Sequence, residues 1–82
     1  MNAATMTAAI ATAAAHARTD TDAVEIVFRD GEFGMRIARA WTPRGKRKAQ
    51  AITIRGWGAT LEAALADTIN EIDATDAFEA TR

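Results

Sequence analysis

The chain has 82 residues, a formal net charge of −1 and no cysteine, serine or tyrosine. This length is enough for one domain, residues 1 to 82, with one small core. The absence of cysteine excludes disulfides, thiolate nucleophiles and cysteine metal sites. His16 is the only histidine, so the usual nucleophile and base pairs of enzymes cannot be assembled within one chain. We therefore expect no enzymatic activity, no catalytic residues, no metal and no cofactor.

No apolar stretch approaches the roughly 18 residues that a membrane-spanning helix needs. The alanine-rich N-terminus lacks both leucine and a basic residue before its apolar run, which argues against a secretory signal. We expect a cytoplasmic protein with no membrane partner.

Residues 1 to 19 consist almost entirely of alanine and threonine, with Met6 and Ile10 as the sizeable apolar side chains within the segment. Alanine favours a helix and Asn2 can cap it, whereas the threonines oppose it. We predict a helix over about 3 to 17 that docks weakly if at all. A flexible N-terminal arm is the alternative.

From residue 23 the pattern becomes the two-residue alternation of strands. The even-numbered residues from Val24 to Phe28 point to one side, and Asp30-Gly31 is typical of a two-residue hairpin turn. The second strand, from Phe33 to Thr42, places Arg39 and Trp41 on the nominal core side near its far end. Because a buried, unpaired arginine is costly, we predict that these two side chains lie beyond the covering helix or past a bulge.

A basic loop over residues 43 to 48 leads into a third strand, about Ala49 to Gly56. Gly56 and Gly58 are predicted to supply the backbone angles of a tight strand-to-helix turn. Thr60 is predicted to cap the first amides of the helix that follows.

The apolar stripe of this helix predicts that it runs from about Thr60 to Asp73 or a few residues further. Phe78 lies off the stripe, so the last residues are predicted to form a separate turn or a frayed tail. The fold class is α+β: a three-stranded antiparallel meander packed on the C-terminal helix, with the N-terminal helix before it, in the order α-β-β-β-α.

Charge is distributed unevenly along the chain. Every charged residue from 36 to 55 is basic, whereas every charged residue from 56 to 79 is acidic. Such a chain attracts anions at one end and repels them at the other. The candidate contact residues of the basic end, in the loop and on the sheet face opposite the core, are Arg36, Arg44, Lys46, Arg47, Lys48 and Arg55, with Trp57 beside them.

Three interpretations of this basic surface stay open. Arginines beside an aromatic ring on an open sheet face suit phosphate contacts and base stacking. Contact with a protein is the second interpretation, and an ordinary solvent-exposed sheet face is the third. Trp41 and Trp57 flank the long hairpin, where each is either a plug of the small core or an interface anchor.

The acidic face of the C-terminal helix contributes three further candidate contact residues, Glu62, Asp67 and Glu71. Its simplest interpretation is a solvated face. Asp73, near the helix end, opposes the helix dipole, which favours a basic partner. The carboxylates spread around the helix with no oxygen-rich loop beside them, so they do not predict a metal site.

The strand-to-helix segment is defined by Gly58, Thr60, Leu61, Glu62, Ala64 and Leu65. It resembles the C-terminal part of HicB-type antitoxin domains, which implies a β-β-β-α arrangement and an antitoxin-like regulatory role. The aromatic-proline segment of that family is missing here and no DNA-binding helix-turn-helix or ribbon follows. The contacts of a partner toxin are therefore not carried over.

Two looser likenesses concern the whole chain. The order helix, three strands, helix is similar to that of double-stranded-RNA-binding domains, without the lysine cluster that those domains carry at the start of their final helix. In shortness and charge patterning the chain is similar to small accessory proteins of phages and mobile elements, including anti-CRISPR inhibitors.

These features lead to two hypotheses about function. In the first, the chain is a non-enzymatic interaction or inhibitor protein that covers a surface on a component of nucleic-acid-handling machinery, with a protein as its partner. In the second, it binds nucleic acid directly through the basic sheet face and the 44 to 48 loop. The small core also suggests a homodimer, formed through the sheet edge or the N-terminal helix.

Overall fold

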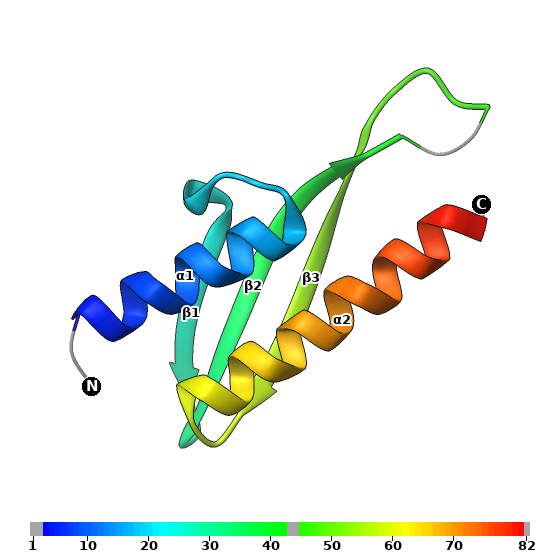
Figure 1. Cartoon of the computed structure of the whole chain (residues 1–82). Coiled ribbons are helices and arrows are strands. Elements are labelled where there is room, and N and C mark those ends of the chain that lie inside the picture. Colours follow the sequence, from blue (N-terminus) through cyan, green and yellow to red (C-terminus); the bar gives the residue numbers. More distant parts are fainter. Residues whose placement is uncertain (1–2, 43–44, 82) are drawn as a thin grey trace.

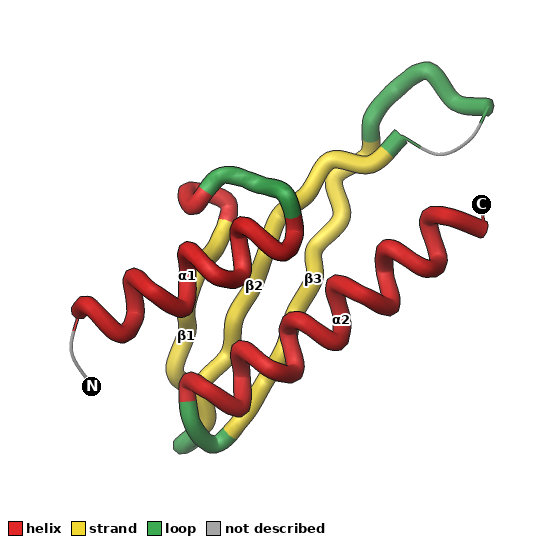
Figure 2. Tube along the Cα trace, in the orientation of Figure 1, coloured by secondary structure: helices red, strands yellow, loops and turns green. Residues whose placement is uncertain are grey.

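Two long helices and a three-stranded sheet follow one another in the predicted order α-β-β-β-α (Figure 1). The computed structural model describes residues 3 to 42 and 45 to 81, and the side chains of residues 4 to 42 and 45 to 79. Its elements are α1 (Ala3–Ala17), the short 3-10 helix η1 (Thr21–Ala23), β1 (Val24–Arg29), β2 (Glu32–Trp41), β3 (Gln50–Gly58) and α2 (Leu61–Thr81). Both long helices lie on one side of the sheet, so the α+β fold has two layers (Figure 2).

The sheet is an antiparallel meander with the strand order β1-β2-β3. Asp30 and Gly31 join β1 to β2, and their φ angles of 55° and 80° are those that a two-residue type I′ turn requires. The predicted hairpin is therefore confirmed. Between β2 and β3 the pairing runs without a break as far as Trp41 opposite Gln50, so no bulge occurs in this ladder.

The core lies between the sheet and the two helices. Large apolar side chains come from the strands and from α2, whereas the buried residues of α1 are alanines, with Ile10 partly buried beside them. The buried apolar residues are Ala9, Ala13, Ala14, Ala17, Val24, Met35, Ile37, Ile54, Leu61, Ala64 and Ile72. One side of the meander is thus covered by α2, as the alternation of the strands and the helical stripe together predicted.

Gly56 and Gly58 serve a different purpose from the one predicted. β3 continues through both glycines, and neither has a left-handed φ. Instead, α2 packs directly on their backbone: a Cβ added at Gly58 would lie 2.5 Å from Ala64 N, and one added at Gly56 would lie 2.7 Å from Thr68 Cα. The two glycines are therefore required for the close approach of the helix to the strand, and not for the turn.

α2 begins after Thr60, whose Oγ1 accepts a 3.1 Å hydrogen bond from the Ala63 amide, so the predicted cap is confirmed. The helix then continues as one element to Thr81, well past Asp73. The prediction of a separate turn or a frayed tail around Phe78 is wrong. The Phe78 and Trp41 ring centroids lie 6.3 Å apart, which gives the additional helical turns a contact on the sheet.

Arg39 lies under this longer helix, and the prediction that it lies beyond the helix or past a bulge is wrong. Its side chain is 9% exposed, and its Nη2 donates a 2.9 Å hydrogen bond to Glu79 Oε1. Its Nη1 lies 2.9 Å from Asp76 Oδ1 as an ion pair without hydrogen-bond geometry. Burial lowers the pKa of Arg39, but the two carboxylates together raise it by more, so the net shift is upward and the group stays a cation.

α1 is helical as predicted, but it is docked and not a loosely attached arm. It packs on β1 and α2 and buries Ala9, Ala13, Ala14 and Ala17. Alanine has no side chain beyond Cβ, so this stripe lets the two helices lie close together at little cost in side-chain entropy. The small side chains of this segment led to the prediction of weak docking. In the structure they allow α1 to approach β1 and α2 closely, and the result is a continuous interface.

Candidate functional site

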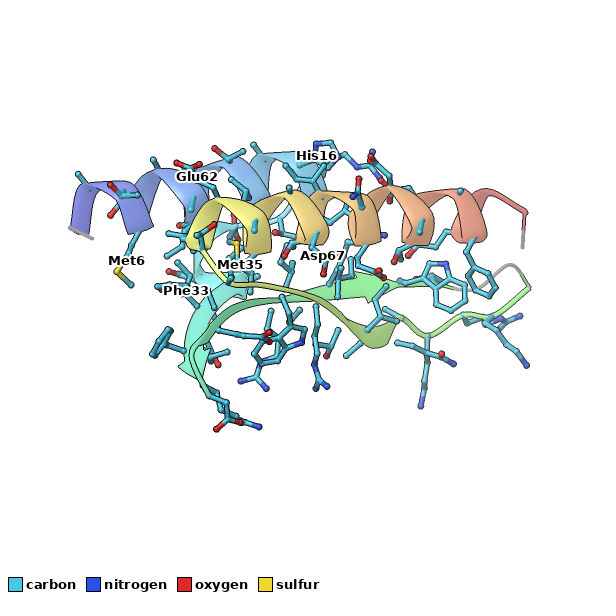
Figure 3. The ribbon with its side chains drawn as sticks, turned by 90° about the horizontal axis from the view of Figure 1, so that it is seen from below. Met6, His16, Phe33, Met35, Glu62 and Asp67 are labelled. Carbon is cyan, nitrogen blue, oxygen red and sulfur yellow. The ribbon has the colours of Figure 1, made fainter. Side chains whose placement is uncertain are left out.

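The sheet side turned away from both helices is uncovered (Figure 3). We call it the open face. The ladder register assigns to it Glu25, Val27 and Arg29 of β1, Glu32, Gly34, Arg36, Ala38 and Ala40 of β2, and Ala51, Thr53, Arg55 and Trp57 of β3. Three of the residues predicted from sequence as contacts, Arg36, Arg55 and Trp57, therefore share one surface.

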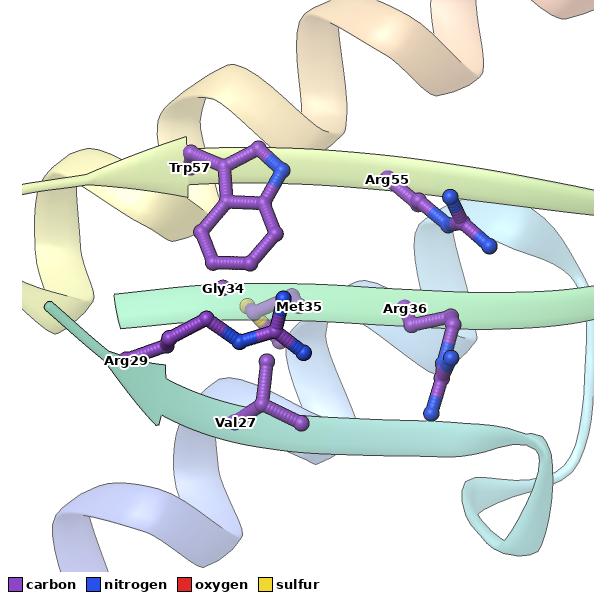
Figure 4. Close-up of a pocket in the computed structure, with 7 residues that line it drawn as sticks. All are labelled: Val27, Arg29, Gly34, Met35, Arg36, Arg55 and Trp57. Atoms are coloured by element: carbon purple, nitrogen blue, oxygen red, sulfur yellow. The ribbon is translucent and has the colours of Figure 1, made fainter. Parts of the chain in front are cut away.

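Trp57 lies across Gly34, its cross-strand partner (Figure 4). A Cβ added at Gly34 would lie 2.7 Å from the Cζ3 atom of the indole, so the benzo ring occupies the space that a side chain on Gly34 would fill. This arrangement covers a glycine in a strand with an aromatic ring. Trp57 is nevertheless 41% exposed, because only one side of the ring packs on the sheet.

Asp67 of α2 holds the strand end that carries this ring. Its Oδ2 accepts a 2.9 Å hydrogen bond from the backbone amide of Trp57. β3 is an edge strand, and an edge amide without a strand partner needs another acceptor. Asp67, which we predicted as a contact residue, thus has a positioning role at the edge of the open face.

Arg36 and Arg55 face each other directly across β2 and β3. Arg36 also forms an ion pair with Glu25, its partner on β1. The ion pairs among the described residues leave Arg55 without a carboxylate partner. Like charges directly opposite each other destabilise a sheet, so the centre of the open face carries an electrostatic cost that only Glu25 offsets.

Two shallow hollows flank this arginine pair. One, of 210 Å³, is lined by Trp57, Arg29, Val27 and Gly34 (Figure 4). The other, of 390 Å³, lies toward η1 and the start of β1. Both hollows have Arg36 and Arg55 in their lining, so the arginine pair lies between them and borders each.

The open face continues along the long β2–β3 hairpin toward the basic loop. Between the arginine pair and the loop it carries only small side chains, Ala38, Ala40, Ala51 and Thr53. Of the loop residues predicted as contacts, Lys46, Arg47 and Lys48 are exposed. Arg44 lies outside the described residues.

The acidic side of α2 is largely engaged within the molecule. His16 Nε2 lies 2.7 Å from Asp73 Oδ1, and Arg18 Nη2 donates a 3.2 Å hydrogen bond to Asp76 Oδ1. Together with the Arg39 contacts described above, these pairs bind the end of α2 to α1 and β2. The side chain of Asp73 therefore already contacts a histidine of the same chain. Of the predicted acidic contact residues, Glu62 and Glu71 are exposed.

Gly34 and Glu25 were not identified as site residues from the sequence. The signal that could have found them is the Asp30-Gly31 turn, because a two-residue loop sets the register of the hairpin. Counting back from that turn pairs Val27 with Gly34 and Glu25 with Arg36. The β2–β3 register that adds Trp57 has no comparable signal, because its loop is long.

The described residues contain no group of three or more histidines, cysteines or carboxylates arranged to hold a metal ion. Neither helix in that part of the chain has the length and apolar character to cross a bilayer. No protein-family model, curated protein or solved structure matches the chain at a significant level.

Proposed function

We propose that the protein is a non-enzymatic binding protein that attaches to an anionic component of nucleic-acid-handling machinery through its open face. It acts, in this proposal, by covering the surface that it binds, as an inhibitor or regulatory subunit does. The observation that carries the proposal is the pairing of Arg36 with Arg55 at the centre of an uncovered sheet face.

A cross-strand pair of like charges is destabilising relative to a neutral pair. An anion placed between Arg36 and Arg55 replaces this repulsion with two charge-assisted hydrogen bonds, which are the stronger kind. The exposed indole of Trp57 adjoins the pair, and tryptophan and arginine are the residue types that contribute most at interfaces. Trp57 and both arginines line the same 210 Å³ hollow, so a ligand there can contact all three.

The alternative contact surface, the acidic side of α2, is less suitable. Asp76 and Glu79 already have cationic partners within the chain, and Asp73 contacts His16. Glu62 and Glu71 stay exposed, but they are nine residues apart and lie on opposite sides of the helix, so they do not form one surface for a basic partner. The open face is therefore the stronger candidate.

Fluorescence anisotropy against a panel of anionic macromolecules tests the proposal. The panel contains single-stranded RNA, duplex DNA and poly-glutamate, each labelled and titrated at low salt. We expect at least one of them to bind and the double variant Arg36→Ala with Arg55→Ala to lose that binding. Arg18→Ala is the matched control, because it removes an arginine that is 73% exposed and lies outside the open face.

No binding to any member of the panel would overturn the proposal. An equal loss in the Arg18→Ala control and in the double variant would also overturn it, because binding would then depend on total charge and not on the open face.

A further inference from the structure

We propose that the ligand of the open face is a single-stranded nucleic acid, with one base stacked on the outer side of Trp57 and the phosphates passing over Arg36 and Arg55. This inference rests on the proposed function and names the class of its ligand. It assigns the indole to the base and the arginine pair to the backbone.

The first step concerns the orientation of the ring. One side of the indole packs on the backbone of Gly34, so the ring lies along the sheet and its other side faces solvent (Figure 4). The hydrogen bond from the Trp57 amide to Asp67 fixes the strand end that carries it. A flat, exposed and positioned aromatic ring is the platform on which an unpaired base stacks, whatever its sequence.

The second step concerns the position of the cations. Arg36 and Arg55 occupy the next row of the open face, two residues along each strand from Gly34 and Trp57. This separation is about 7 Å at the usual rise of a strand. A base on the indole therefore places its own phosphate, or that of its neighbour, within reach of two guanidinium groups.

The third step decides between a single strand and a duplex. The strands of the open face carry three arginines and two glutamates, so the local excess of positive charge is small. A duplex offers phosphates but hides the faces of its bases, so its binding would depend on charge alone and gain nothing from the exposed indole. A single strand adds a stacking contribution, which the exposed indole can supply.

An acidic polypeptide is the competing ligand class, and it fits less well. Its carboxylates pair with the arginines, but it has no regular supply of planar rings for the indole. The small side chains beyond the arginine pair leave a smooth path of about 23 Å from Trp57 to Gln50 along β3. This path ends near Lys46, Arg47 and Lys48, whose exposed charges can bind further phosphates.

The test compares an oligouridylate of about 12 nucleotides, a length within the range of small single-strand binding sites, with a duplex RNA of equal length. We expect the single strand to bind more tightly. Trp57→Ala is expected to weaken its binding about 5- to 150-fold, the loss of one stacked base. Phe28→Ala is the matched control, because Phe28 is an exposed aromatic residue on the other side of the sheet and should leave the affinity unchanged.

A second measurement does not depend on the stability of the Trp57 variant. Trp41→Phe leaves Trp57 as the only tryptophan, and we expect its fluorescence to be quenched on addition of the oligouridylate. Trp57→Phe, which retains only Trp41, should show little quenching. Replacing Lys46, Arg47 and Lys48 by alanine is expected to lower the salt dependence, the slope of log K on log salt, by about 2.

The outcomes separate this inference from the function on which it rests. Equal or tighter binding of the duplex, unchanged affinity in Trp57→Ala, or binding of poly-glutamate alone would each overturn the single-strand assignment while leaving the open face as a binding surface. Absence of binding to every polyanion would overturn both.

Discussion

The packing of α2 directly on the backbone of β3 can be tested at Gly56. In Gly56→Ala, the added Cβ would lie 2.7 Å from Thr68 Cα and closer still to the amide nitrogen of the same residue. Thr68 is fully buried, so the helix must move away from the strand to make room. Overpacking of this kind costs typically 1–3 kcal/mol. We expect a value near the upper end of this range, because the obstructing atoms include backbone atoms of Thr68, which cannot rotate away as a side chain can. Replacing a strand glycine by alanine returns about 0.5–1 kcal/mol.

The expected net loss is therefore about 2 kcal/mol in the free energy of unfolding. For a domain of this size it corresponds to a decrease of about 8–16 °C in Tm. Urea denaturation followed by circular dichroism measures the first quantity and a thermal melt the second.

Gly34→Ala is the matched control, because a Cβ added there would also lie as close as 2.7 Å to an existing atom. That atom belongs to the exposed ring of Trp57, which can swing into solvent, so we expect a loss below about 1 kcal/mol. In a Trp57→Ala background the same substitution should be neutral or stabilising. If Gly56→Ala stays within about 0.5 kcal/mol of the wild type, or if both glycine variants lose equally, the close approach of α2 is not what requires glycine.

Three further substitutions test other contacts by the same urea titration. Arg39→Ala leaves Glu79 without its cation and Asp76 with Arg18 alone, and we expect a loss of about 2 kcal/mol, less than for a fully buried pair; a neutral result would mean that the cluster adds no net stability. Thr60→Ala removes the cap of α2 and should cost about 1 kcal/mol, whereas full stability would show that water replaces the cap. Ala13→Leu should cost about 1–3 kcal/mol by separating α1 from the core, and Ala11→Leu on the exposed side should be neutral. Equal effects at these two positions would contradict the docking of α1.

The acidic and basic parts of the charge pattern differ in how far they are paired within the fold. The carboxylates near the end of α2 contact His16, Arg18 and Arg39, so much of the apparent polarity of the chain is neutralised by its own fold. Arg55 has no such partner among the described residues. A strongly patterned sequence therefore leaves positive charge in two places, on the open face and at the exposed loop residues Lys46, Arg47 and Lys48.

Local signals in the sequence determined the order of the elements and the inward and outward sides of the strands. Alternation identified the side of each strand, Asp30-Gly31 marked the hairpin, and Thr60 marked the start of α2. These signals are reliable because they act between residues that are close along the chain, so backbone geometry alone carries them.

Only the tertiary structure decided the features that depend on contacts distant in sequence. The role of Gly56 follows from how closely α2 packs on β3. The burial of Arg39 depends on carboxylates that come much later in the chain, such as that of Glu79, which is 40 residues away. The packing of the Trp57 ring on Gly34 requires the register of β2 against β3. These strands are joined by a long loop, so no local pattern specifies that register. Residue types and periodicity thus determined which side chains face outward, whereas the pairing of strands and helices determined which of them meet to form the open face.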